Sequence, residues 1–204
     1  MPSNRQVLDI NIVNCGGLRD LMSEMEASFL VSALGLFRNV QDLGRAKPRA
    51  NVNLIRAYDP KGFYDSAVRD AHLLHVIGHA DKDKLEVSYA KARVKASELG
   101  VQARRRGRQL PPIIVATGCK MQSDAWRAGM RSAGAEVLIA SETEPSPAAL
   151  TSFDMAFYSA LLAQQRRGKT LVERISESFV LADEHYRKIH AVGSPFAKFK
   201  LIAL

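Results

Sequence analysis

The segment from Pro111 to Thr117 (PPIIVAT) constrains the fold of this chain more than any other. Its branched apolar residues run without interruption, and Gly118 and Cys119 follow at once. Strands have this character when helices cover both faces of a parallel sheet, because neither face of the strand then meets water. The segment from His72 to His79 (HLLHVIGH) is similar. Together they predict an α/β protein with a mostly parallel central sheet and helices on both faces.

Strand-like and helix-like segments alternate along the rest of the chain, which is the order expected of such a sheet. Strands are expected at residues 7–13, 51–58, 72–79, 111–117, 136–140 and 196–204, the last at an edge. Helices are expected at residues 18–37, 63–71, 95–106, 124–133, 148–165 and 170–188, with Ser123 capping one of them. Residues 59–62 are expected to form a turn or loop and residues 84–91 a small hairpin. One doubly wound domain over residues 1–204 accounts for all of these segments.

Composition and sequence patterns limit the classes of protein to which this chain could belong. The first thirty residues show no secretory signal, and no apolar run approaches the roughly 20 residues that cross a bilayer, so we expect a cytoplasmic protein without membrane contact. Two cysteines, Cys15 and Cys119, argue against a disulfide framework. The net charge of +8 invites nucleic-acid binding, but the basic run from Arg104 to Arg108 has no interleaved aromatic side chains to stack on bases. Nucleic acid is therefore not an expected partner.

Two of the expected strands end in side chains that can do chemistry. His79 closes the strand that begins at His72, and Cys119 follows Gly118 at the end of the strand at 111–117. Ligands of open parallel sheets bind beyond the carboxyl ends of the strands, so neighbouring strands would bring these residues together. A histidine can take the proton of a cysteine thiol, and the thiolate then attacks a carbonyl carbon. The pattern predicts acyl transfer, with the N–H groups of Ala80 and Cys119 as oxyanion donors.

Each residue also has an ordinary interpretation, which the pattern leaves open. Cys119 alone fits a buried apolar position, and His79 alone fits a hydrogen-bonded loop histidine. His75 and His79 have the spacing of zinc ligands on a helix, but Val76 and Ile77 between them favour a strand. No metal site and no cofactor are therefore expected. Core packing is the expected role of Cys15, His72, Met121 and Trp126.

Three segments carry a resemblance to a known family: LLHVIGHA, LEVSYAKARVKASELG and IIVATGCKMQS, in this order. They resemble the caspase-like cysteine peptidases, and most the branch that contains CHAT domains and separase. In that branch one strand ends in Gly-His-Gly, and after a hairpin and a helix a second strand ends in a small residue and cysteine. GAEVLIASE, FDMAFYSALLAQQRRGKTLVERISES and FAKFKLIAL are similar to later elements of the family. Ala80 stands where the family usually has glycine, and the Gln-Ala-Cys signature of caspases is absent, so cleavage after aspartate is not implied.

The resemblance implies a cysteine endopeptidase with Cys119 as nucleophile and His79 as general base. Its expected partners are a protein or peptide substrate and, if the enzyme is latent alone, an activating protein. A catalytically idle scaffold or interaction module of the same fold stays open as the alternative. Residues 103–109 (ARRRGRQ) lie where several family members carry a processing loop, although an exposed helix end accounts for them more simply.

Acidic residues follow the ends of two strands. Asp81 comes soon after His79, and Glu142 comes soon after the strand at 136–140. A carboxylate in the pocket for the residue before the scissile bond would pair with a lysine or arginine side chain. The sequence therefore predicts a preference for a basic residue, with Asp81 or Glu142 as the substrate-binding group. Ordinary solvated loop acids are the alternative.

Overall fold

The computed structural model describes residues 7–16, 20–42, 50–87, 92–143, 145–163, 169–190 and 198–204. Within these residues, six strands form one sheet in the order β2-β1-β3-β6-β7-β8. Their bounds are β1 Leu8–Asn14, β2 Ala50–Arg56, β3 Leu73–Ile77, β6 Ile113–Ala116, β7 Val137–Ser141 and β8 Phe199–Ala203. Neighbouring strands are parallel except β7 and β8, so β8 is an antiparallel edge strand.

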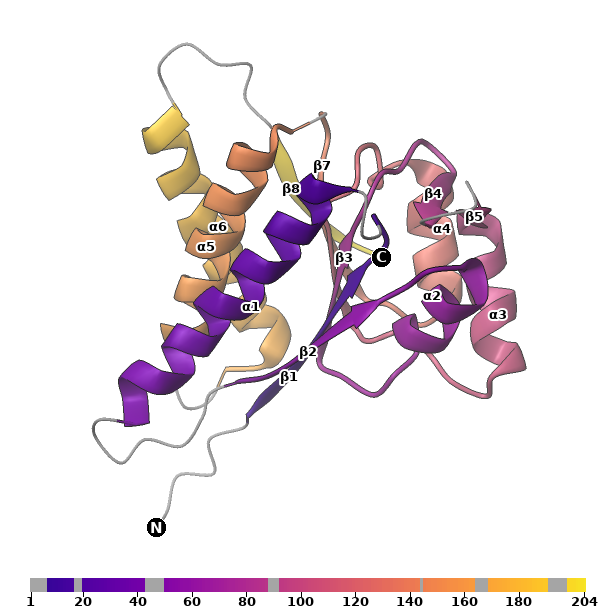
Figure 1. Cartoon of the computed structure of the whole chain (residues 1–204), viewed down its shortest axis with the longest axis horizontal. Coiled ribbons are helices and arrows are strands. Elements are labelled where there is room, and N and C mark those ends of the chain that lie inside the picture. Colours follow the sequence, from indigo (N-terminus) through magenta and orange to yellow (C-terminus); the bar gives the residue numbers. More distant parts are fainter. Residues whose placement is uncertain are drawn as a thin grey trace.

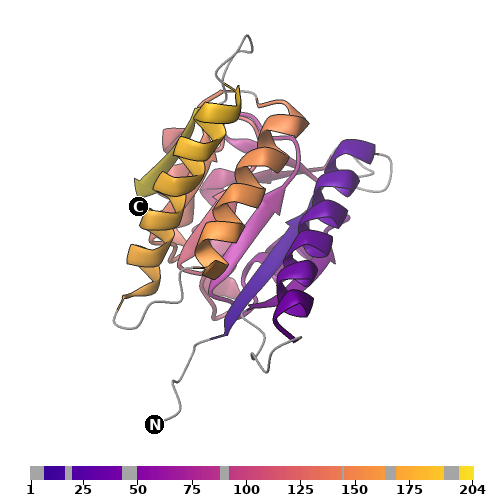
Figure 2. The same ribbon diagram turned by 90° about the vertical axis from the view of Figure 1, so that its left-hand side faces the viewer.

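In the described part of the chain, helices cover both faces of this sheet (Figure 1). One face carries α1 Leu21–Asp42, α5 Pro147–Ala163 and α6 Leu171–His190, which lie side by side in Figure 2. The other face carries α2 Pro60–Ala67, α3 Leu99–Arg105 and α4 Asp124–Ser132, with the 3-10 turn η1 Ala96–Glu98. A small antiparallel pair, β4 Lys84–Val87 and β5 Ala92–Lys95, lies on the same side as α4.

Strand side chains alternate between the two apolar layers, as the pleat requires. Ile10 and Ile12 of β1 are fully buried with residues of α1, α5 and α6, whereas Val13 is buried with residues of α2, α3 and α4. On the edge strand, the ring of Phe199 stacks on that of Phe153 with centroids 3.9 Å apart. Each fully buried side chain of this size contributes roughly 1.5–3 kcal/mol. These layers hold the strand ends, and the residues beyond them, in fixed positions.

The mostly parallel sheet with helices on both faces confirms the fold class predicted from the sequence. The prediction for residues 59–62 was wrong. Asp59 accepts a hydrogen bond from the Gly62 backbone N–H at 2.6 Å, and Pro60 begins α2. Aspartate is a good N-cap and proline suits the first helical position, so this pair starts a helix instead of breaking one.

The other predicted elements agree with the structure to within a few residues. In the predicted hairpin, residues 88–91 lie outside the described residues, and β5 begins after them. The predicted ends at residues 165 and 196 also lie outside the described residues. None of the helices described is both long and apolar enough to span a bilayer.

Candidate active site

Strands β3 and β6 are neighbours, and their pairing brings the two predicted catalytic segments together. Val76 pairs with Ala116, and the Thr117 backbone N–H donates to the Val76 carbonyl at 3.0 Å. Both strands run in the same direction, so both chains leave the sheet at the same edge. The segments that carry His79 and Cys119 therefore begin side by side beyond the ends of β3 and β6.

The glycines before these residues allow the two loops to touch. A Cβ atom added at Gly118 would lie 3.0 Å from the Ala80 Cβ and 3.0 Å from the Gly78 carbonyl oxygen. Gly78 has a φ of +155°, and a Cβ there would lie 3.0 Å from the Cβ of Cys15. Larger residues would separate the loops, so glycine at these positions is a requirement of the close approach.

His79 has a carboxylate partner that the sequence analysis missed. Its Nε2 lies 2.8 Å from Oδ2 of Asp20, and its side chain is 66% exposed. Asp20 precedes α1 and is itself held by the Ser23 hydroxyl at 2.6 Å and the Ser23 backbone N–H at 3.3 Å. Because β1 lies beside β3, the start of α1 lies beside the end of β3. Three adjacent strands, β1, β3 and β6, therefore lead to Asp20, His79 and Cys119.

Asp20 is ionised over most of the pH range. Burial alone would raise the pKa of Asp20, but the hydrogen bonds from Ser23 and the charge and hydrogen bond of His79 outweigh it and leave the pKa lowered. An aspartate just before an apolar periodic segment is a helix N-cap signal. That signal marks Asp20 in the sequence, but it does not reveal that the cap would also reach His79.

The two thiols differ in access. Cys15 is buried in the α2–α4 layer, and burial raises the pKa of its thiol well above the usual value. Cys119 is partly exposed. Lys120, directly after it, has a φ of +58°, a left-handed conformation that non-glycine residues rarely adopt. Such backbone strain is often found at functional sites. Cys15, Met121 and Trp126 are core residues as predicted.

His72 is a departure from the predicted core role. Its side chain is 28% exposed, and its Nδ1 accepts a hydrogen bond from the Asp9 backbone N–H at 3.0 Å. It lies just before β3, at the edge of the sheet opposite to His79. His72 therefore ties the start of β3 to β1 rather than filling the core.

The backbone conformation of Ala80 is one that alanine adopts without strain. Of the non-glycine residues described, Lys120 has a positive φ and Ala80 does not. Ala80 forms an isolated bridge with Leu85, flanked by hydrogen bonds from Asp81 N–H to the Lys84 carbonyl and from Glu86 N–H to the His79 carbonyl. In this type of antiparallel pair the N–H of Ala80 points away from Leu85. Alanine in place of glycine therefore costs this loop no backbone strain.

The two predicted substrate-binding acids already have partners. Oδ1 of Asp81 accepts from the backbone N–H groups of Asp83 and Lys84, both at 3.1 Å, and these bonds lower the pKa of Asp81. The Glu142 carboxylate forms an ion pair with Lys200 of β8. Asp81 follows His79 closely, whereas Glu142 follows β7, which lies beyond β6 from His79. Asp81 therefore lies nearer to His79 along the sheet edge.

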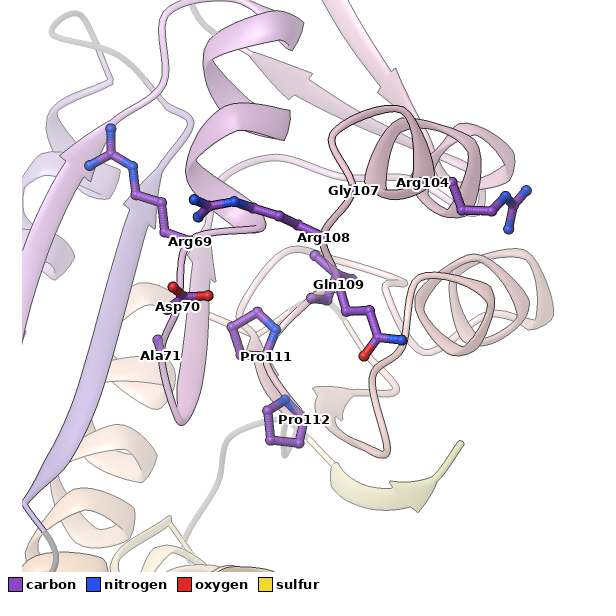
Figure 3. Close-up of a pocket in the computed structure, with 10 residues that line it drawn as sticks. Arg69, Asp70, Ala71, Arg104, Gly107, Arg108, Gln109, Pro111 and Pro112 are labelled. Carbon is purple, nitrogen blue, oxygen red and sulfur yellow. The ribbon is translucent and has the colours of Figure 1, made fainter.

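The basic segment at 103–109 is the end of α3, and it lies at the opposite edge of the sheet because it precedes β6. Arg106 pairs with Asp65 at 2.7 Å. A cavity of about 630 Å³ opens at this edge, and its lining includes Arg69, Arg104, Arg108 and Pro112. Figure 3 shows Arg108 extending towards Arg69 while Arg104 points away. This cavity is remote from His79 and Cys119, which follow the other ends of the same strands.

The mainly parallel six-stranded sheet between two helical layers has a caspase-like fold. The structure is similar to the Saccharomyces cerevisiae separase in its solved complex with securin, with a TM-score of 0.51 and 14% identity over 97% of this chain. It is also similar to gingipain R, described as an Arg-specific cysteine proteinase, with a TM-score of 0.54 and 11% identity over 90% of this chain.

The chain spans 12% of the separase chain and 42% of the gingipain chain. At these identities the likeness is one of fold. No family model matches the sequence. No curated protein matches it either.

Proposed function

We propose that this chain is a cysteine endopeptidase, with Cys119 as nucleophile, His79 as general base and Asp20 as the group that orients His79. The observation that carries the proposal is the 2.8 Å contact between His79 and Asp20 beside the strand end that bears Cys119. A base held by a carboxylate next to a thiol is the arrangement of nucleophilic catalysis. The motifs around His79 and Cys119 favour the CHAT-domain and separase branch, and we expect a cytoplasmic enzyme.

The contact with Asp20 determines which nitrogen of His79 carries the proton in the proposed reaction. With the carboxylate bound at Nε2, the neutral imidazole carries its proton there, and Nδ1 has the free lone pair that accepts the Cys119 proton. The thiolate attacks the peptide carbonyl carbon and forms a carbon–sulfur bond. The same Nδ1 proton then goes to the departing amine as the peptide bond breaks. Water hydrolyses the thioester and returns Cys119 to the thiol.

The oxyanion that forms during attack needs donors. We assign this role to the backbone N–H groups of Ala80 and Cys119. The N–H of Ala80 points away from Leu85, and the loop that carries it touches Gly118. Loss of one oxyanion donor lowers kcat by roughly 10²–10³-fold in other acyl-transfer enzymes.

We infer a preference for a lysine or arginine before the scissile bond, with Asp81 as the first candidate for its partner. Asp81 is exposed and follows His79 closely, and its lowered pKa keeps it ionised. Its Oδ1 accepts the two backbone N–H groups of the turn. Glu142 is the weaker candidate because Lys200 already neutralises it. Gingipain R, of similar fold, is Arg-specific by its description.

Two measurements test the proposal. An acyloxymethylketone probe with lysine or arginine next to the warhead should label Cys119 faster than Cys15, because a thiolate beside a base is the nucleophile and Cys15 is buried. Equal labelling in the native protein, read by peptide mass spectrometry, would count against the dyad. A positional peptide library should then show cleavage after basic residues, reduced in Asp81→Asn. Cleavage confined to aspartate or small apolar residues would remove the basic preference but not the dyad.

The alternative is a catalytically idle scaffold. One face of α1, starting directly after Asp20, exposes apolar side chains: Leu21, Met25 and Phe29 are 68%, 56% and 41% exposed. Exposed apolar patches often mark protein-binding surfaces. A scaffold would bind a protein partner equally well after Cys119→Ala. It would cleave no peptide of the library, even with an activating partner present.

A further inference from the structure

A second cluster of chemically active side chains lies inside the molecule, away from the sheet edge. Glu26 of α1, His75 of β3 and Asp154 of α5 converge between the sheet and the helical layer that contains α1 and α5. The side chains of His75 and Asp154 are fully buried, and that of Glu26 is 8% exposed. Buried acids of this kind are rare unless they are paired.

Four polar atoms of this cluster have no hydrogen-bond partners among the described residues. They are Oε1 of Glu26, Nε2 of His75 and both carboxylate oxygens of Asp154. Nε2 lies 3.8 Å from Oε1 of Glu26 and 3.8 Å from Oδ2 of Asp154. A hydrogen bond needs about 2.7–3.2 Å between nitrogen and oxygen, so neither contact is one. Buried polar atoms normally have hydrogen-bond partners. Unpartnered polar atoms that face one another in the interior therefore need an explanation.

The charge of the cluster points to a cation. Two ionised carboxylates around a neutral imidazole would place two negative charges in the interior, which costs several kcal/mol per ion without compensation. A bridging water would satisfy at most two acceptors and would leave both charges. A divalent cation would satisfy every unpartnered atom and neutralise both acids.

The geometry fits a metal of the first transition row. The three ligand atoms lie within 4.8 Å of one another. Zinc at about 2.0–2.2 Å from its ligands separates neighbouring ligands by roughly 3.3–3.6 Å, so a small inward movement completes the site. The second oxygen of Asp154 offers a fourth donor without another residue. Imidazole suits zinc better than magnesium or calcium, which prefer oxygen ligands throughout.

The imidazole is oriented for this role by a second contact. Nδ1 of His75 hydrogen-bonds the Tyr158 hydroxyl at 2.8 Å, so it can carry the ring proton and leave the Nε2 lone pair facing the two carboxylates. We propose that Glu26, His75 and Asp154 form a buried structural site for one divalent transition-metal ion, best matched by zinc. The ion would join α1, α5 and β3, the two helices and the strand that support the exposed edge.

The test uses the untagged full chain with Cys119→Ala, which removes the partly exposed thiol as a competing zinc ligand. After dialysis against a weak chelator, elemental analysis should find one zinc per chain, released only when denaturant unfolds the protein. Glu26→Gln and Asp154→Asn should each lower the affinity for zinc by at least the roughly 10–100-fold that loss of a group behind a ligand costs, or abolish binding. Glu24→Gln is the matched control, since this acid of the same helix is already bound by Arg56 and should retain the metal.

A second measurement tests the proposal even if these variants fail to fold. The Cys119→Ala chain refolded from denaturant with zinc should have a higher Tm than the same chain refolded with chelator, because a ligand of the native state stabilises it. Cobalt in place of zinc should give ligand-field absorption without sulfur charge transfer. Another first-row metal at one per chain, lost in the same variants, would equally support the site. A metal-free chain with an unchanged Tm, or zinc retained by Glu26→Gln and Asp154→Asn, would overturn the proposal.

Discussion

His75 and His79 belong to the same strand segment, but the two regions around them use histidine in opposite ways. His79 lies beyond the end of β3, is 66% exposed and has one carboxylate at 2.8 Å. His75 lies inside β3, is fully buried and faces two carboxylates at 3.8 Å. An exposed imidazole can exchange protons with a substrate, whereas a buried one between acids mainly decides whether those acids can stay in the interior. Position relative to the sheet edge therefore separates a catalytic candidate from a structural one.

The largest expected effect is on activity at the edge. His79→Ala and Cys119→Ala should each lower kcat/KM by at least about 10³-fold, because nucleophile and base act as a unit. Since His79 is mostly exposed, the free energy of unfolding should change by no more than roughly 0.5 kcal/mol. Peptide turnover and denaturant unfolding of the same preparations check both statements. Normal turnover by either variant would end the dyad hypothesis.

The second prediction concerns His75, the interior histidine, where the expected effect is on stability instead of activity. His75→Ala should lower the free energy of unfolding by about 3–5 kcal/mol, because it leaves Glu26 and Asp154 buried without their shared neighbour. Urea unfolding monitored by circular dichroism measures this change. His185→Ala is the control, since His185 is exposed on α6 and should alter stability little. A His75→Ala protein as stable as the parent would show that the interior cluster carries no such strain.

The smallest expected effect concerns the charge of Asp20. The folded pKa of Asp20 is lowered, so its contribution is present above the unfolded pKa and is lost as pH falls through the folded value. Asp20→Asn keeps an N-cap oxygen but removes this charge. The variant should be less stable than the parent by at most about 1 kcal/mol near neutral pH. Unfolding curves at several pH values should converge towards the acid end; a constant or growing difference would contradict the assignment.

Much of the fold followed from local patterns. The buried strand β6 is a continuous apolar run, and β3 is one apart from His75, because both faces of these strands are covered. Ser123 caps α4 as predicted and accepts from the Trp126 backbone N–H. The loop predicted at Asp59 and Pro60 was wrong because the same residues suit a helix start, and only the following turn decides between the two.

What the sequence by itself determined was the set of strand ends, and with it His79 and Cys119 as candidates that leave one edge of a parallel sheet. Their chemistry depends on short sequence motifs and on the pairing register of neighbouring strands, and residues close to them in the sequence set both. Only the tertiary structure brought Asp20 to His79, and Glu26 and Asp154 to His75. The acids belong to α1, its start and α5, whereas the histidines belong to β3 and the segment after it, so their approach depends on how the helices pack on the sheet. A carboxylate in a helical pattern looks the same whether it faces water or a buried imidazole. Packing decides which, since burial and the cost of an uncompensated charge are properties of the assembled layers.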